Sequence, residues 1–291
     1  MHPTRREVLS LSAAALAAAA CRTDDPRAAP IEPSMATTRM PSLFVSHGAP
    51  TLAVDPVAGA DFTRMATKLP TPRAVLTLSA HWLDAPATIG TRSTRELLYD
   101  FGGFPDELYR VRYEAPAAAD VAARVETLLP DVRRDDDRPW DHGVWVPLLH
   151  MFPAADVPVL QLSLPYRWTP KQLFELGRSL APLRDEGVLV LGSGGAVHNL
   201  RAVDWRGEAP TPTWATDYEG WLRERLLAGQ FDDVVAFRER APALRQAHPT
   251  DEHFLPLLVA LGAAADRGDA VTFPIEGWEL GSMSRLAVRF G

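Results

Sequence analysis

The chain has 291 residues, of which 46% are hydrophobic, and a formal net charge of −7. This length suits one large α/β domain or two small ones, and the apolar content is that of a folded core, not of a disordered chain. The negative charge and the lack of a basic stripe argue against nucleic acid as a partner, and a single cysteine excludes an intrachain disulfide.

Residues 1–39 have the composition of an export signal followed by a linker. Arg5 and Arg6 precede the Leu- and Ala-rich stretch Leu9–Ala20, which is too short to span a bilayer and has the length of a signal-peptide core. We interpret this pattern as a bacterial twin-arginine signal, which predicts an exported, periplasmic protein. Cys21 follows directly and resembles the lipidated cysteine of a lipoprotein, a membrane attachment, although the match is imperfect at Ala18. Ordinary cleavage nearby, or an Ala-rich helix with incidental charges, are the alternatives.

The remaining chain, residues 40–291, shows no linker, repeat or shift of composition, which predicts one domain. Apolar runs predict strands at Leu43–Ser46, Ala74–Ala80, Ala87–Gly90, Val157–Leu164, Val188–Leu191, Val271–Ile275 and Leu286–Phe290. Helical spacing and start signals predict helices at Ala117–Leu129, Lys171–Leu183, Trp214–Leu227 and His253–Leu261. The alternation predicts an α/β fold, a single domain with a central mostly parallel (mixed) β-sheet flanked by helices. The charged stretch Arg133–Trp140 is expected to be a solvated loop.

Histidines stand where several of these strands end. His47 ends the first run, His81 ends the second, and His198 follows the Gly-rich turn after Val188–Leu191. Strand ends deliver side chains to the sheet edge where open α/β folds bind ligands, so these positions predict one metal site assembled from distant segments. Taken alone, each position is more readily explained as a structural histidine, and it is their joint pattern that favours a metal site.

Two other enzyme sites are disfavoured by their patterns. The Gly-rich turn at Ser193 does not match the G-x-S-x-G elbow of serine hydrolases. Val197 stands where the third glycine of a dinucleotide-binding G-x-G-x-x-G motif would be.

Six segments in chain order resemble a known family. They are Ser46–Pro50, Ser79–Trp82, Asp100–Pro105, Asp141–Gly143, Val197–Arg201 and His253–Leu257. Together they resemble the class III extradiol ring-cleavage dioxygenases, in particular their 4,5-DOPA dioxygenase subgroup. The resemblance runs from about Met40 to Gly291.

The resemblance implies a role for five of the histidines. His47, His81 and His253 match the three metal ligands, and His198 matches an acid/base histidine that in some members is close enough to count as a fourth ligand. His142 matches a histidine that lines the substrate pocket. Trp82, Phe101, Phe104 and Trp145 are candidates to wall a flat substrate, although core packing explains at least half of them.

The implied reaction is the extradiol opening of a catechol-type ring by O₂. It needs a redox-active metal, normally Fe(II), and a group such as a histidine that takes and returns a proton. The usual third ligand is a carboxylate, whereas here it is His253, so Zn(II) suits the site as readily as Fe(II). Asp251, Glu252 and Glu276 are candidates for a missing carboxylate.

Two alternatives remain open from the residues. One is a zinc-dependent hydrolase that uses a metal-bound water with His198 as the base. The other is a periplasmic binding protein for a small planar ligand, which predicts neither metal nor turnover.

Overall fold

The computed structural model describes residues 38–90 and 97–291, which all belong to one compact unit. The predicted export signal, the greater part of the linker and Cys21 lie outside the described residues. Among the helices that are described, none combines the length and the apolarity that a membrane span requires.

Ten strands and ten α-helices are seen in the described residues. The strands are β1 (Ser42–Ser46), β2 (Ala74–Ser79), β3 (Thr88–Gly90), β4 (Arg133–Asp135), β5 (Val159–Leu162), β6 (Val188–Gly194), β7 (Val271–Ile275), β8 (Trp278–Glu279), β9 (Met283–Ser284) and β10 (Ala287–Phe290). The helices are α1 (Pro56–Ala66), α2 (Ala119–Leu128), α3 (His142–Met151), α4 (Pro170–Leu180), α5 (Pro182–Asp185), α6 (Thr213–Leu227), α7 (Phe231–Val235), α8 (Phe237–Arg240), α9 (Leu244–Ala247) and α10 (Leu255–Gly262).

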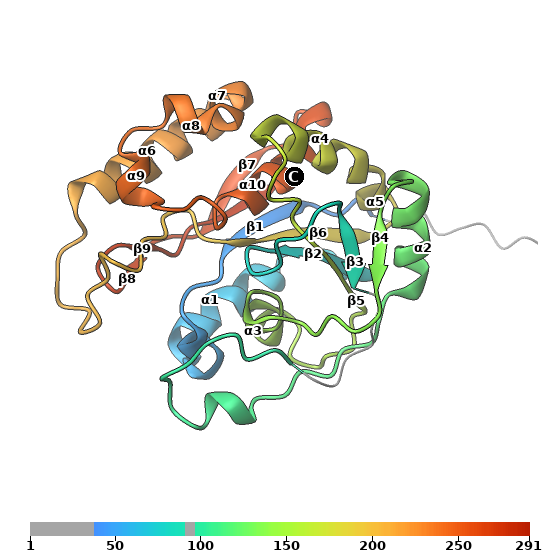
Figure 1. Ribbon diagram of the computed structural model, residues 1–291, viewed down its shortest axis with the longest axis horizontal. Coiled ribbons are helices and arrows are strands. Elements are labelled where there is room, and N and C mark those ends of the chain that lie inside the picture. The colour runs from blue at the N-terminus through green and yellow to red at the C-terminus, as the bar shows by residue number, and fades with distance from the viewer. Residues whose placement is uncertain (1–37, 91–96) are drawn as a thin grey trace, which may run out of the picture. The chain divides into compact units, whose positions relative to one another are not determined.

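The centre of the fold is an eight-stranded sheet in the order β4-β3-β5-β2-β6-β1-β10-β7 (Figure 1). The four central strands β5, β2, β6 and β1 run parallel to one another. Antiparallel pairs join β10 to β1, β7 to β10 and β3 to β5. The predicted α/β class with a mostly parallel, mixed sheet is therefore confirmed.

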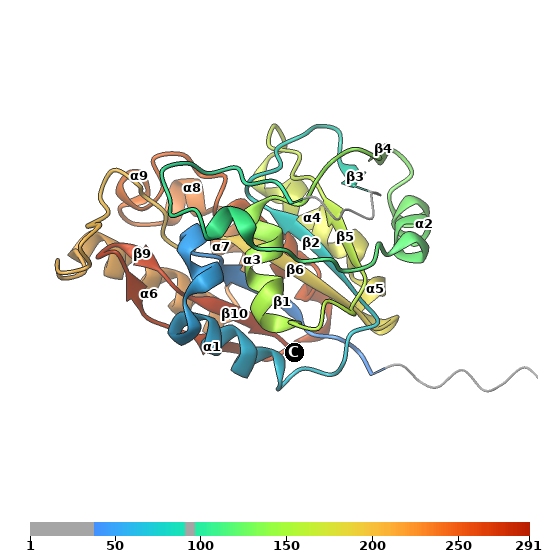
Figure 2. The same cartoon turned by 90° about the horizontal axis from the view of Figure 1, so that it is seen from below.

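The central strands are buried on both faces, as their continuous apolar sequences predict. In β1, Leu43 and Val45 enter one hydrophobic core, and Phe44 enters the other. Helices α1 and α3 cover the first face, and α4 and α10 cover the second (Figures 1 and 2). The successive side chains of each strand thus alternate between two separate cores.

Helix boundaries follow local signals, some of which the sequence analysis used. Thr169 and Gln172 form a capping box at the start of α4, which ends at Leu180 because Pro182 opens the separate helix α5. The single helix predicted over Lys171–Leu183 is therefore two. Helix α1 was not predicted, although Asp55 accepts hydrogen bonds from the backbone N–H groups of its first turn.

The segment Arg133–Trp140 is not simply a solvated loop. Residues Arg133–Asp135 form β4, the parallel partner of β3 at the sheet edge, and the side chain of Trp140 is 1% exposed. An edge strand pairs through its backbone on one side only, so its side chains need no apolar pattern. This is why the hydrophobic pattern of the sequence did not reveal it.

Candidate metal centre

Three neighbouring parallel strands deliver the first part of the site. His47 directly follows β1, His81 comes two residues after β2, and β6 ends at Gly194 between them. Backbone hydrogen bonds fix these ends, from the N–H of His47 to the carbonyl of Gly194 at 2.9 Å and from that of Ala80 to the carbonyl of Ser193 at 3.0 Å. The carboxyl ends of the strands therefore meet at one sheet edge, as expected for an open α/β fold.

His253 reaches the same edge from the turn before α10. The N–H of Gly195 donates to the carbonyl of His253 at 2.9 Å. A Cβ atom on Gly194 would lie 2.1 Å from that carbonyl oxygen, and one on Gly192 would lie 2.4 Å from the carbonyl oxygen of Pro256. The glycines of β6 are thus needed for the close approach of this turn to the strand.

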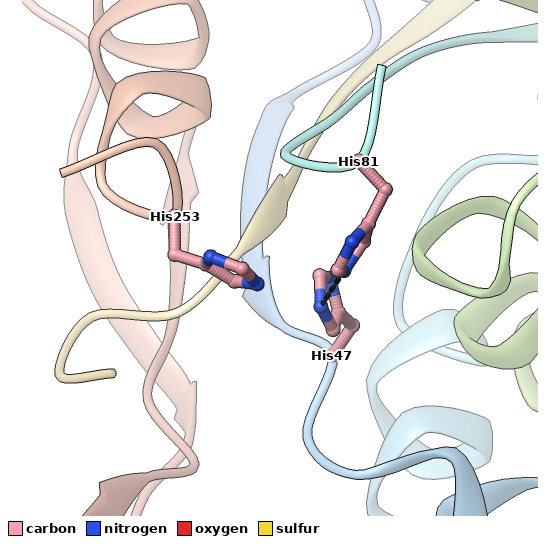
Figure 3. Close-up of side chains that lie close together, drawn as sticks. All are labelled: His47, His81 and His253. Carbon is pink, nitrogen blue, oxygen red and sulfur yellow. Dashed lines mark hydrogen bonds between the residues drawn. The ribbon is translucent and has the colours of Figure 1, made fainter. Parts of the chain in front are cut away.

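The imidazole rings of His47, His81 and His253 point toward one another (Figure 3). The Nε2 atoms of His47 and His81 are 3.1 Å apart, and the ring centroid of His253 lies 5.4 Å and 4.9 Å from the centroids of the other two. One ring nitrogen from each histidine lies within 4.8 Å of the others. Residues far apart in the chain thus form one cluster.

Oxygen atoms face the outer nitrogen of each ring. The Nδ1 of His47 lies 3.0 Å from the hydroxyl of Ser193, which itself donates to the carbonyl of Gly143 and so accepts from the ring. The Nδ1 of His253 is 3.1 Å from Oε1 of Glu252. A carboxylate has no proton to give, so the ring nitrogen carries it and the Nε2 lone pair is left for a metal ion.

His81 has a similar but looser partner. Its Nδ1 lies 3.5 Å from Oδ2 of Asp100, a contact longer than a normal hydrogen bond. The Oδ1 atom of Asp100 accepts hydrogen bonds from the ring Nδ1 of His142 at 2.8 Å and from its backbone N–H at 3.1 Å. Burial raises the pKa of Asp100, but hydrogen bonding and proximity to His142 outweigh it, and the pKa is lowered. The carboxyl group is therefore ionised at neutral pH.

The residues present fit a divalent metal ion. The Nε2 atom of His253 is buried and has no hydrogen-bond partner in the described part of the chain. Two facing Nε2 lone pairs 3.1 Å apart repel each other unless a cation or proton lies between them. Imidazole ligands of one ion, each about 2.0–2.1 Å from it, are roughly 3 Å apart.

Burial keeps these imidazoles in the neutral form that binds metals. It holds the pKa of His47 well below the usual range, with His81 as the next cause, and does the same for His253, with His198 as the next cause. Burial and then His142 lower the pKa of His81 to about 4. Metal binding at neutral pH therefore requires no proton release from these rings.

His198 lies beside the three-histidine cluster and not within it. Its ring stacks on that of His253, with centroids 3.5 Å apart and planes 6° apart. Its nitrogen groups with those of His253 and Glu252, and among the described residues no comparable grouping joins it to His47 and His81. The geometry thus favours a position next to the metal ligands over that of a fourth ligand. Burial, followed by His248, lowers the pKa of His198 to about 4, so the ring is neutral at neutral pH.

The cluster forms one end of a cavity of about 370 Å³. His142 lines this cavity, as do Phe101 and Phe104, whereas Trp82 and Trp145 are 5% and 0% exposed and belong to the core. Two of the four candidate aromatic residues are therefore in position to flank a planar ligand.

The candidate carboxylates fall into two groups. Glu252 lines the cavity, while Asp251 pairs with Arg238 at 2.7 Å and Glu276 pairs with Arg223 at 2.5 Å, both outside it. Sequence reasoning missed Asp100 and Ser193 as partners of the imidazoles. Asp100 entered the sequence analysis only as the first residue of a segment that resembles the family, and Ser193 only as the serine of a Gly-rich turn that lacks the hydrolase motif.

Comparisons with known proteins agree with this site. Residues 42–291 match the family described as the catalytic LigB subunit of aromatic ring-opening dioxygenase. The chain is 39% identical to the 4,5-DOPA dioxygenase extradiol of Escherichia coli over 88% of this chain and 97% of the relative, and 36% identical to that of Beta vulgaris over 86% and 96%. A crystal structure of an uncharacterized Escherichia coli protein superimposes with a TM-score of 0.73 at 34% identity and covers 87% of this chain and all of its own. The chain therefore belongs to the LigB family of class III extradiol dioxygenases, which are metal-dependent enzymes that open aromatic rings.

Proposed function

We propose that this dioxygenase uses Fe(II), held by His47, His81 and His253, to open the ring of a catechol, as the names of its 4,5-DOPA dioxygenase relatives suggest. The observation that carries the proposal is the convergence of three neutral imidazoles, each with its outer nitrogen facing an oxygen atom, at the end of a cavity. When bound there, Fe(II) would supply the redox chemistry that lets O₂ react with the catechol.

Two further histidines complete the proton chemistry. His198 is neutral, lines the cavity and forms no ring hydrogen bond within the described residues, so it can take a proton from a catechol hydroxyl and later return it. His142 donates its Nδ1 proton to Asp100, which fixes the orientation of the ring at the cavity, where it can contact a substrate hydroxyl. Phe101 and Phe104 flank the substrate ring and keep water away from it.

The carboxylates of the site compensate for an all-imidazole ligand set. Glu252 faces Nδ1 of His253 and Asp100 faces Nδ1 of His81, and such carboxylate partners raise the basicity of the ligating imidazole. The negative charges would thus contact the ligating imidazoles and would not coordinate the metal directly. We therefore expect the site to bind Zn(II) as well, and the zinc form to be inactive in ring opening, because zinc has no redox chemistry.

The test is catechol-dependent O₂ consumption after anaerobic loading with Fe(II). We expect about one O₂ per catechol and, with ¹⁸O₂, both labelled atoms in the ring-opened product, with no consumption by the zinc-loaded protein. An iron-loaded protein that consumes no O₂ with any catechol would contradict the proposal.

We also propose that the chain is exported through a twin-arginine signal and lipidated at Cys21. Support comes from the sequence pattern alone, the pair Arg5 and Arg6 before an apolar stretch that ends at the cysteine. Changing both arginines to lysine should leave the protein in the cytoplasm. Cys21→Ser should release exported protein from the membrane fraction; periplasmic delivery of the double-lysine variant would overturn the proposal.

A further inference from the structure

We infer that the substituent-binding part of this cavity is built for a neutral, apolar group, so that the preferred substrates are alkyl- or aryl-substituted catechols and not catechols that carry a carboxylate. The inference rests on the proposed function, because it concerns the same cavity. It departs from what the names of the relatives suggest, since DOPA carries both a carboxylate and an ammonium group.

Apart from its histidines, Asp100 and Glu252, the cavity lining is apolar, and we call its large apolar side chains the apolar wall. Its large side chains are Phe101, Phe104, Leu200, Trp205, Leu280 and Met283. Two of them, Leu200 and Trp205, are 58% and 63% exposed. Large apolar side chains exposed together at the wall of a cavity are typical of a surface that an apolar ligand covers.

Hydrogen bonds join the segment that carries Leu200 and Trp205 to the segment that carries Leu280 and Met283. The N–H of Asp204 donates to the carbonyl of Leu280 at 2.9 Å, and the hydroxyl of Ser282 donates to the carbonyl of Ala202 at 3.2 Å. The wall is therefore a formed part of the fold and joins two segments that are distant in sequence.

The charges of the cavity do not suit an anionic substituent. The charged side chains of its described lining are Asp100 and Glu252, and both face imidazole nitrogens. Among the described residues, neither a lysine nor an arginine lines the cavity. A carboxylate on the substrate would lose its hydration when it contacts Leu200 and Trp205 and would find no positively charged partner, so its binding free energy would be less favourable. Burial of an alkyl group against the same two side chains would instead favour binding.

Two basic residues are adjacent in sequence to this wall, Arg201 after Leu200 and Arg206 after Trp205, and Arg206 is exposed and does not line the cavity. Arg201 lines a separate, smaller hollow of about 170 Å³, which shares His198, Leu200 and Glu252 with the cavity. Arg138, another nearby cation, packs over the ring of Trp82 and lies 3.3 Å from Asp141. The three guanidinium groups of Arg138, Arg201 and Arg206 thus stand outside the cavity lining, and Arg201 provides a direct control for the inference.

The test compares two substrates of matched shape on the Fe(II) holoenzyme, 4-propylcatechol and 3-(3,4-dihydroxyphenyl)propanoate, with DOPA as a third. We expect kcat/KM to favour the propyl compound by about tenfold or more, mainly through KM, because the uncompensated carboxylate must be desolvated. Leu200→Arg should reduce this ratio about tenfold by supplying a partner charge. Leu227→Arg, a change of an equally exposed leucine on α6, should leave the ratio unchanged, as should Arg201→Ala.

The outcomes separate the inference from the proposed function. Equal or better turnover of the propanoate or of DOPA by the wild type would overturn the inference and leave the dioxygenase activity intact. A drop in carboxylate turnover in Arg201→Ala would also overturn it, because Arg201 would then be the missing cation. Failure to consume O₂ with any of the three catechols would contradict the proposed function itself.

Discussion

One oxygen atom of Asp100 accepts both the ring Nδ1–H and the backbone N–H of His142, at 2.8 and 3.1 Å. The other oxygen faces the ring of His81 at 3.5 Å. A single carboxylate thus orients a histidine of the substrate cavity and a proposed metal ligand, whose rings lie 4.1 Å apart. Metal affinity and substrate binding should therefore both depend on Asp100.

Asp100→Asn should weaken metal binding by roughly 10–100-fold, the usual effect of losing a partner of a ligating histidine. The asparagine amide keeps an acceptor for His142 but presents no charge to His81. Affinity is measured by competition with a chelator, with circular dichroism as a check on folding. The matched control is Asp106→Asn, an exposed carboxylate of the same loop. Equal affinities for the two variants would contradict the role assigned to Asp100.

Gly194→Ala should displace His253, because the new Cβ would lie 2.1 Å from a backbone oxygen that cannot move independently of the turn. We expect loss of bound metal and a loss of about 1–3 kcal/mol in the free energy of unfolding, as for other overpacked sites. Gly220→Ala is the control, since open space surrounds Gly220 on α6 and alanine there should stabilise the helix by roughly 0.5–1 kcal/mol. A Gly194→Ala protein with full metal content would show that this close packing is unnecessary.

The metal-free protein should lose stability as the pH falls from about 6.5 to about 4. Burial lowers the pKa of His248 to about 4, although its hydrogen bond to the carbonyl of Ala196 opposes the shift. Between these two pH values the unfolded chain therefore binds a proton that the folded chain does not. Each such histidine contributes a slope of up to about 1.4 kcal/mol per pH unit, with stability rising with pH. Urea unfolding at several pH values measures it.

The matched variant for this pH dependence is His248→Gln, which keeps an N–H donor but does not titrate. In this variant the free energy of unfolding should change less steeply with pH than in the wild type, because one fewer proton is taken up on unfolding. A wild-type stability that stays constant between pH 6.5 and pH 4.5 would contradict the neutral, buried state of these rings.

His198→Gln should keep the metal and lose turnover, by about 10²- to 10⁴-fold in kcat, because it removes a proton-transfer group without removing a ligand. The control is His150→Gln on α3, where the ring donates to the carbonyl of Leu52 and lies outside the cavity lining. If His198→Gln instead loses the metal, the histidine is a fourth ligand. An unchanged kcat would refute its proton-transfer role.

The parts of the site that were predictable from sequence are those carried by local pattern. Continuous apolar runs end at His47 and His81, and because such runs form parallel strands, their ends had to share a sheet edge. The third histidine, His253, lies before a helix, and its assignment relied on the family resemblance.

The partners of these residues were not predictable, because they meet only in the folded chain. Ser193 and Asp100 reach their histidines from 146 and 42 positions away in sequence, and no spacing rule connects them. The apolar wall at Leu200 and Trp205 was also hidden, since both residues lie in a stretch of turns outside any helix or strand, where no periodicity marks them. These hydrogen-bond partners and the apolar wall are determined by tertiary contacts, which the hydrophobic periodicity of the sequence does not reveal.

The most direct test of the account is the metal content of the wild type and of the single variants His47→Ala, His81→Ala and His253→Ala, each loaded anaerobically with Fe(II) and then desalted. The wild type and the His150→Ala control should retain about one equivalent of iron per chain, and each of the three variants should lose most of it. Retention of a full equivalent by all three variants would show that these rings do not hold the metal, and would contradict the account at its centre.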